Sequence, residues 1–226
     1  MQNIIEIFTE PRAVFERIQD KGQGWLPWLL VSILGVASSW LYFSNVDSQW
    51  LAQELVRQAS TSGASKVTVE QMQASITGMK YGGIIGAPIS VALLFALSAI
   101  YLLLAGKLIG ANQGFKQWFN FSAWASMPAV ISSIAAIVAV VTMSPQTAME
   151  TLRVTTVDAL VLHLPIDSPW RSFAGAADLM SIWSIALSTI GLQVWTRCSR
   201  MTAIVVCALP YVVIYGVWAA VIVAKH

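Results

Sequence analysis

Five long apolar segments, separated by polar connections, set the pattern of the chain. They cover residues 25–43, 83–106, 121–143, 179–196 and 201–224, and none contains Asp, Glu, Lys, Arg or His. A membrane-spanning helix needs about 20 mostly apolar residues, whereas strands in soluble proteins are about 5–6 residues long. We therefore predict an all-α integral membrane protein, a five-transmembrane-helix bundle that forms one domain over residues 1–226.

The N-terminal tail, residues 1–24, is predicted to contain a short amphipathic helix. Pro11 suits the first helical position, because its missing N–H costs nothing there. Val14, Phe15 and Ile18 would share one apolar face of the helix that follows. Such a helix either lies in the headgroup plane of the membrane or caps the end of the bundle, and the sequence leaves both alternatives open.

Two long polar loops, residues 44–82 and 144–178, are predicted on the outer side. The first is expected to hold two short interfacial helices, the second of which begins with a capping box of Thr68 and Gln71. The other loop contains an apolar stretch, residues 157–164, that is too short to span a membrane. These loops form either a lid or docking surface, or solvated segments packed on the bundle.

Aromatic residues gather where the first and third spans begin. Because amphipathic aromatic rings are enriched at membrane–water interfaces, we predict interfacial anchors at these positions: Trp25, Trp28, Phe115, Trp118, Phe119 and Trp124. Pro128 follows about one turn inside the third span, and its ring is expected to kink that helix.

Small and hydroxyl-bearing residues recur at helical spacing in the second and fourth spans. Small side chains let membrane helices approach one another closely, so these positions are predicted to be packing seams. A polar-lined conduit is the alternative, although hydroxyls in helices commonly bond to nearby backbone carbonyls. The positions are Gly82, Gly86, Pro88 and Ser90 in the second span, and Ser181, Ser184, Ser188 and Gly191 in the fourth.

Composition supports a lipid environment and excludes several classes of protein. Hydrophobic residues make up 57% of the chain and charged residues 11%, against about 25% charged residues in a soluble domain. This argues against a soluble enzyme and a disordered chain. A net charge of +2 provides no basic patch for nucleic acid, so no nucleic-acid partner is expected.

The distribution of basic residues gives the expected orientation. With the N-terminus inside, the inner segments carry seven of the thirteen basic residues on much shorter connections: Arg12, Arg17, Lys21, Lys107, Lys116, Arg197 and Arg200. Because basic residues favour the cytoplasmic side, we predict a multi-pass protein of the bacterial inner membrane, with a cytoplasmic N-terminus and a periplasmic C-terminus.

Candidate chemistry is sparse. No motif or spacing identifies a catalytic, cofactor-binding or metal-ligating residue, since His163 and His226 lie apart from any cluster of metal ligands. The spans carry no charge of the kind that coupled carriers use as proton relays. Asp178 stands at the start of the fourth span, where its carboxylate is expected to cap the helix. We therefore expect a protein that is not an enzyme and has no cofactor.

Several stretches resemble bacterial Yip1-domain proteins. They are FTEPRAVF at residues 8–15, GFKQWFN at residues 114–120 followed by Ala123 and Pro128, and ADLMSIWSIALSTIGL at residues 177–192. The resemblance extends over nearly the whole chain and implies a single Yip1-like membrane domain with five spans. Eukaryotic members are similar to membrane scaffolds that engage Rab-type GTPases. Their longer N-terminal region has no counterpart in residues 1–24, so the resemblance does not carry GTPase binding over.

Two functions remain as hypotheses. The first is a non-enzymatic scaffold that organises the lipid bilayer or assembles with other membrane proteins, including a homo-oligomer formed through the small-residue seams. The alternative is a channel or carrier for a small uncharged or lipid-like solute, with a path lined by Ser90, Ser181, Ser184 and Ser188. A third class, an intramembrane enzyme, would need a catalytic cluster that the sequence does not show.

Overall fold

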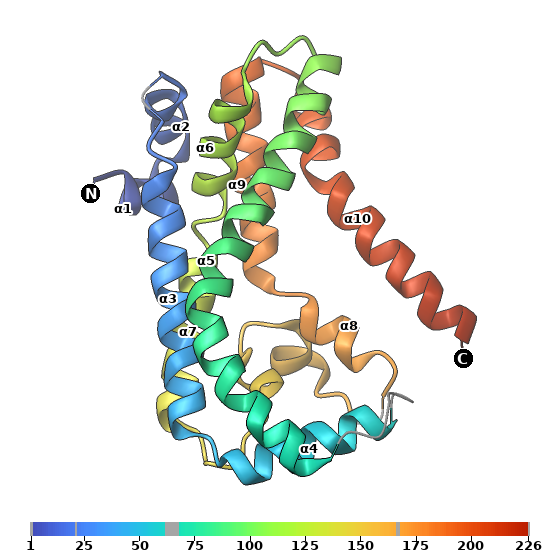
Figure 1. The fold of residues 1–226 in the computed structure, drawn as a ribbon. Coiled ribbons are helices and arrows are strands. Elements are labelled where there is room, and N and C mark those ends of the chain that lie inside the picture. Colours follow the sequence, from blue (N-terminus) through green and yellow to red (C-terminus); the bar gives the residue numbers. More distant parts are fainter. Residues whose placement is uncertain (1, 21, 62–67, 166–167, 226) are drawn as a thin grey trace.

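Apolar helices dominate the structure, a computed structural model that describes residues 2–20, 22–61, 68–165 and 168–225. Four helices are long and apolar enough to cross a membrane: α3 (Trp25–Asn45), α5 (Val69–Leu108), α9 (Leu179–Thr196) and α10 (Arg200–Lys225). A fifth crossing is formed if α6 (Phe115–Ala125) and α7 (Ala129–Thr142), which meet at 45°, are one broken span. The chain is thus an all-α membrane bundle, as predicted (Figure 1).

Shorter helices lie at the two ends of this bundle (Figure 1). The tail end carries α1 (Gln2–Thr9) and α2 (Pro11–Asp20), together with the α5–α6 connection and the α9–α10 turn. The loop end carries α4 (Ser48–Thr61) and the connection between α7 and α9. That connection contains a 3-10 turn at Met149–Leu152, a π-helical turn at Asp158–Leu162 and α8 (Arg171–Ala176).

Helix α5 is too long to lie wholly within a membrane. Its 40 residues at 1.5 Å each make a rod of about 60 Å, about twice the thickness of the hydrocarbon core. Its first turns therefore extend beyond the membrane at the loop end, where α4 packs against α5. The predicted capping box is confirmed, since Thr68 accepts from the Gln71 N–H and the Gln71 side chain accepts from the Thr68 N–H.

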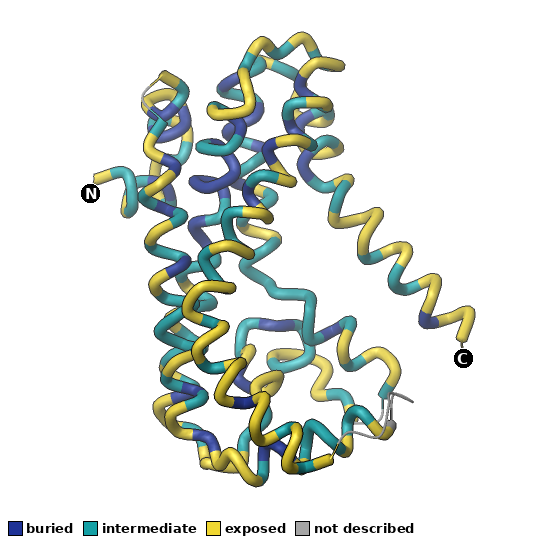
Figure 2. The backbone as a smooth tube through the Cα atoms, in the orientation of Figure 1, coloured by how far each residue is buried: buried dark blue, intermediate teal, exposed yellow. Residues whose placement is uncertain are grey.

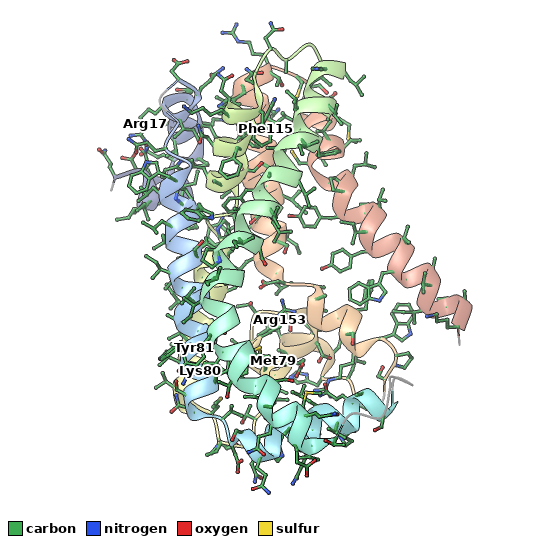
Figure 3. The ribbon with its side chains drawn as sticks, viewed as in Figure 1. Arg17, Met79, Lys80, Tyr81, Phe115 and Arg153 are labelled. Atoms are coloured by element: carbon green, nitrogen blue, oxygen red, sulfur yellow. The ribbon has the colours of Figure 1, made fainter. Side chains whose placement is uncertain are left out.

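The boundary expected near residue 83 is absent from α5. The second helix predicted in the 44–82 loop and the span that follows it are one continuous helix. The fall in apolar character before residue 83 is not a helix end, and we expect it to mark the membrane surface. Lys80 and Tyr81 flank that surface, with the Lys80 Nζ 4.3 Å from the ring centroid of Trp40 and the Tyr81 ring 5.8 Å from it (Figure 3).

The segment predicted as the third span is bent near Pro128, where a kink was predicted. Helix α6 ends at Ala125, and Pro128 stands at the position before α7 begins. A proline removes one backbone donor and clashes with the preceding turn. The turn instead closes with short-range bonds, from the Met127 N–H to the Trp124 carbonyl and from the Ala129 N–H to the Ser126 carbonyl.

Helix α10 leaves the bundle soon after its start (Figure 1). Ala203 and Cys207 are buried against the rest of the bundle, whereas apolar residues farther along, such as Val212 and Val223, are exposed (Figure 2). Near the loop end the Tyr215 hydroxyl donates to the Ala176 carbonyl at 2.8 Å. Lipid is thus the expected neighbour of most of this helix.

Candidate interaction site at the tail end

The N-terminal tail is built into the bundle. Ile7 of α1 and Val14, Phe15 and Ile18 of α2 are each at most 2% exposed, and α2 packs mainly against α9. The Trp195 indole N–H of α9 donates to the Phe15 carbonyl at 2.8 Å in a buried hydrogen bond. Helix α2 therefore caps the end of the bundle, which is one of the two alternatives predicted for it.

A cluster of aromatic rings receives the tail. Phe121 lies 5.0 Å from both Phe15 and Trp195 between ring centroids, and Trp118 lies 5.4 Å from Trp195. Phe15, Phe121 and Trp118 are fully buried. Aromatic pairs at such separations add about 0.5–1.5 kcal/mol beyond the burial of their area, so α2, α6 and α9 are joined by specific ring contacts.

These positions correct part of the predicted aromatic belt. Trp118 and Trp124 are both 0% exposed, so they are core residues and cannot anchor the chain at the membrane surface. Trp28 donates its indole N–H to the Pro88 carbonyl at 3.1 Å, which ties α3 to α5. Phe119 packs against Phe95 and Phe115: its ring centroid lies 6.0 and 6.2 Å from theirs.

Two of the predicted anchors are exposed, and Trp28 and Phe119 are of intermediate exposure. Trp25 is 61% exposed at the first residue of α3, and Phe115 is 45% exposed at the first residue of α6. Aromatic side chains at the ends of spanning helices are typical of the headgroup level. Their interfacial role therefore stays a prediction that the positions favour.

Gly191 lies where the tail presses most closely on α9. A Cβ atom at this position would stand 2.7 Å from ring atoms of both Phe15 and Phe121. Only a residue without a side chain lets both buried rings approach the α9 backbone so closely. The packing seam predicted at Gly191 is thus a contact within this chain, between the tail and the fourth span.

Asn120 of α6 locks the connection between α2 and α3. Its Oδ1 accepts from the Gly24 N–H at 3.1 Å. A Cβ atom on Gly22 would lie 1.7 Å from the Asn120 Nδ2, and one on Gly24 would lie 2.4 Å from its Oδ1. Gln117, one turn earlier, donates to the Gln19 carbonyl at 3.4 Å. The GFKQWFN segment therefore fixes where α2 ends.

A polar cavity of about 400 Å³ lies beside this joint. One wall comes from the end of α2 and the connection after it, and the other from the first two turns of α6. The wall contains one carboxylate and one ammonium group, four carboxamides and one glycine: Asp20, Lys116, Gln19, Gln23, Gln117, Asn120 and Gly22. Sequence reasoning did not identify this cavity, because its residues belong to segments about 95 positions apart.

The outward face of α2 is polar. Arg12, Glu16 and Asp20 are exposed at four-residue spacing, which places them in one row along the helix. Arg17 pairs with Glu6 of α1 (Figure 3), and the hydrogen bonds from Arg17 and then from Gln2 lower the pKa of the Glu6 carboxyl. The tail thus presents fixed charges of both signs at the surface of the tail end.

At the opposite end of α9, Asp178 caps the helix. Its Oδ1 accepts from the Met180 N–H at 2.8 Å, and its Oδ2 accepts from the Thr155 hydroxyl at 2.9 Å. Two backbone bonds join the same segments: Val157 donates to Ala177, and Leu179 donates to Thr155. Asp178 therefore holds the loop-end connection on the start of the fourth span.

The predicted seam in the second span faces outward. Gly82, Gly86 and Ser90 are exposed, and a Cβ atom on Gly82 or Gly86 would meet nothing within 4 Å. The close approach to α3 occurs one residue away, where a Cβ atom on Gly83 would lie 2.8 Å from the Ser39 Oγ. The Gly82–Gly86–Ser90 row is therefore open to lipid or to another protein.

The serine positions do not meet in a described cavity. Neither the cavity at the tail end nor a smaller one of about 110 Å³ at the loop end is lined by Ser90, Ser181, Ser184 or Ser188. The Ser188 hydroxyl donates to the Ser184 carbonyl at 2.8 Å, within its own helix. A hydroxyl bonded in this way has its donor occupied, which gives no support to a polar path along α9.

No grouping of side chains in the described ranges indicates metal chemistry. Within residues 2–20, 22–61, 68–165 and 168–225, no set of three or more His, Cys, Asp or Glu side chains could hold a metal ion. Cys198 and Cys207 are both free thiols. What the tail end offers is therefore a surface and a polar cavity for non-covalent binding.

Comparison with known proteins agrees with this architecture. The family model of the Yip1 domain matches residues 5–221. The membrane protein YknW of Bacillus subtilis (strain 168) is 30% identical over 192 residues, which cover 84% of this chain and 77% of that protein. No solved structure matches the chain significantly.

Proposed function

This chain belongs to the Yip1 domain family, and we propose that it is a non-enzymatic scaffold that holds a protein partner on the outward face of α2. The partner would bind at the cytoplasmic surface of a bacterial inner membrane, since the tail end carries the basic residues of the short connections. A second membrane protein or another copy of this chain would meet this description.

The observation that supports the proposal is the burial of the apolar face of α2, formed by Val14, Phe15 and Ile18. This apolar face would be out of water in lipid as well. The hydrophobic effect alone therefore does not determine whether α2 lies in lipid or against the bundle. The ring contacts of Phe15 and the hydrogen bond from Trp195 are available only in the bundle. They hold the charged row of α2 in one orientation, and a preformed surface loses less entropy when a partner binds.

The conduit hypothesis receives less support from the same structure. The four serines proposed to line a path do not line either described cavity. A partner-binding surface needs no continuous cavity through the membrane, whereas a conduit does. The scaffold is therefore the function that the arrangement of the described residues favours.

A charge exchange on α2 tests the proposal without disturbing the core. The double variant Arg12→Glu and Glu16→Arg keeps the net charge and alters two exposed residues. Removing the tail would be a poor test, because it would uncover Phe121 and Trp195. The matched control exchanges Glu54 and Arg57, an ion pair of α4 at the opposite end.

The assay is gentle purification from native membranes followed by quantitative mass spectrometry of protein and lipid. We expect a partner in fixed ratio to the wild-type chain, retained by the α4 control and depleted about tenfold by the α2 exchange. A depletion of that size corresponds to about 1.4 kcal/mol of binding free energy. Equal recovery from all three proteins, or no partner from any, would overturn the proposal.

A further inference from the structure

The polar cavity at the tail end has oppositely charged walls. Asp20 contributes a carboxylate from the last residue of α2, and Lys116 contributes an ammonium group from the first turn of α6. No ion pair within 4.0 Å joins these two side chains. Both residues line a space of about 400 Å³ and are exposed, so a ligand that carries both signs could reach both charges.

These charges are placed against the preference of their helices. A helix C-terminus favours a cation and an N-terminus favours an anion, yet Asp20 ends α2 and Lys116 lies in the first turn of α6. A bound cation beside Asp20 and a bound anion beside Lys116 would compensate both mismatches. The polarity of the cavity thus fits a zwitterion with its positive group toward α2 and its negative group toward α6.

The amide groups of the wall add directional donors. The Asn120 Oδ1 is engaged by the Gly24 N–H, and its Nδ2, which lies close to Gly22, is a further amide donor. The Lys116 ammonium provides further donors on the same side. An anionic group with several acceptor oxygens, such as a phosphate, matches this wall, while a primary ammonium with three N–H donors matches the Asp20 carboxylate.

The position of the cavity indicates where its ligand comes from. Gln23 of the cavity wall lies two residues before the exposed Trp25, and Lys116 directly follows the exposed Phe115. Trp25 begins a candidate span, and Phe115 begins α6, the first half of the bent pair that could form another, so the cavity is expected to open at headgroup depth. We propose that it binds the phosphoethanolamine headgroup of a membrane phospholipid, a role that does not depend on the proposed protein partner.

Native mass spectrometry of the full chain, delipidated in mild detergent, tests this assignment. The probes are dioleoyl lipids that differ in their headgroups: phosphatidylethanolamine, phosphatidylcholine and phosphatidylglycerol. The wild-type chain is expected to bind phosphatidylethanolamine about tenfold more tightly than the other two, because only this headgroup joins a phosphate to an ammonium that donates hydrogen bonds.

Two single variants separate the walls of the cavity. Asp20→Asn should remove the preference for phosphatidylethanolamine over phosphatidylcholine, and Lys116→Gln should weaken the binding of all three lipids. Glu10→Gln and Lys107→Gln make the same changes of charge at the tail end outside the cavity wall, and both should bind as the wild type does. All four positions are exposed, so folding is expected to survive and is checked by size-exclusion chromatography and thermal unfolding.

Three outcomes would overturn the proposal. The first is equal binding of phosphatidylethanolamine and phosphatidylcholine by the wild type, and the second is unchanged binding by both cavity variants. The third comes from soluble glycerophosphoethanolamine, which has the headgroup without acyl chains. If it bound as tightly as the lipid, the ligand would be a soluble metabolite and the assignment to membrane lipid would be wrong.

Discussion

Replacing Gly191 by alanine tests whether the tail is held by packing at one point of α9. The added methyl group would stand 2.7 Å from ring atoms of Phe15 and Phe121. Both rings are fully buried, so they cannot swing into solvent to make room. The variant therefore asks how much of the tail's attachment depends on the absence of a side chain at this position.

The expected magnitude follows from two opposing contributions. A Gly→Ala change inside a helix stabilises it by about 0.5–1 kcal/mol, and overpacking a filled core destabilises by about 1–3 kcal/mol. Gly86→Ala is the matched control, since a Cβ atom there meets nothing within 4 Å. Because the helix contribution is common to both variants, the difference between them, about 1–3 kcal/mol, reports the packing at Gly191.

Thermal unfolding in detergent, followed by tryptophan fluorescence, measures this difference near Trp195. At about 2–4 °C per kcal/mol for a chain of this size, the Gly191→Ala midpoint should fall several degrees below that of Gly86→Ala. Hydrogen exchange should accelerate in α2 before it does so in α3. Phe15→Leu in the Gly191→Ala background should recover part of the loss, as expected for residues in contact. Equal midpoints for the two glycine variants would refute the reasoning.

Three other perturbations address other parts of the molecule. If the exposed small-residue row of α5 joins two copies, Gly86→Leu should lower the oligomer size in detergent and leave the fold of the single chain intact. An unchanged oligomer size would exclude that interface. Asp178→Ala should cost about 1–2 kcal/mol in thermal unfolding and increase hydrogen exchange around Thr155, whereas unchanged exchange there would contradict the capping role. Arg17 lowers the pKa of the Glu6 carboxyl below its ordinary value of 4.5. The contact between α1 and α2 should therefore be intact above that value and weaken as the pH falls through the lowered pKa. Hydrogen exchange in α1 that stays constant over this pH range would argue against the ion pair of Glu6 and Arg17.

The crossings of the membrane could be predicted because lipid imposes a strong constraint on sequence. A helix must satisfy its own backbone groups in lipid, so each apolar run of sufficient length indicates a helix without knowledge of its neighbours. The limits of α5 were harder to place. Its polar first turns and its apolar part form one helix through Gly82 and Gly83. A helix keeps the same geometry where it passes from water into lipid, so the change in composition does not indicate a helix end.

The buried aromatic residues of α6 show why the site could not be predicted from the pattern of apolar and polar residues. Trp118 and Trp124 stand near the start of a span, where interfacial anchors are also found, and the same residue types serve both roles. Trp118 is buried against Gly106 of α5 and Trp195 of α9, and Trp195 lies more than 70 residues later in the chain. The face that α2 buries was evident from its periodicity, but the identity of its partner was not.

Asn120 links the two proposals at the level of the fold. Its side chain occupies the space that Cβ atoms on Gly22 and Gly24 would fill, and so determines how the chain leaves α2 and enters α3. The same geometry leaves Arg12 and Glu16 exposed on α2 and the polar cavity between Asp20 and Lys116. A partner on α2 and a lipid in the cavity would therefore lie on adjacent faces of the joint between α2 and α3. Occupation of the cavity should then influence the outward face through α2 itself, with no need for movement of the spans.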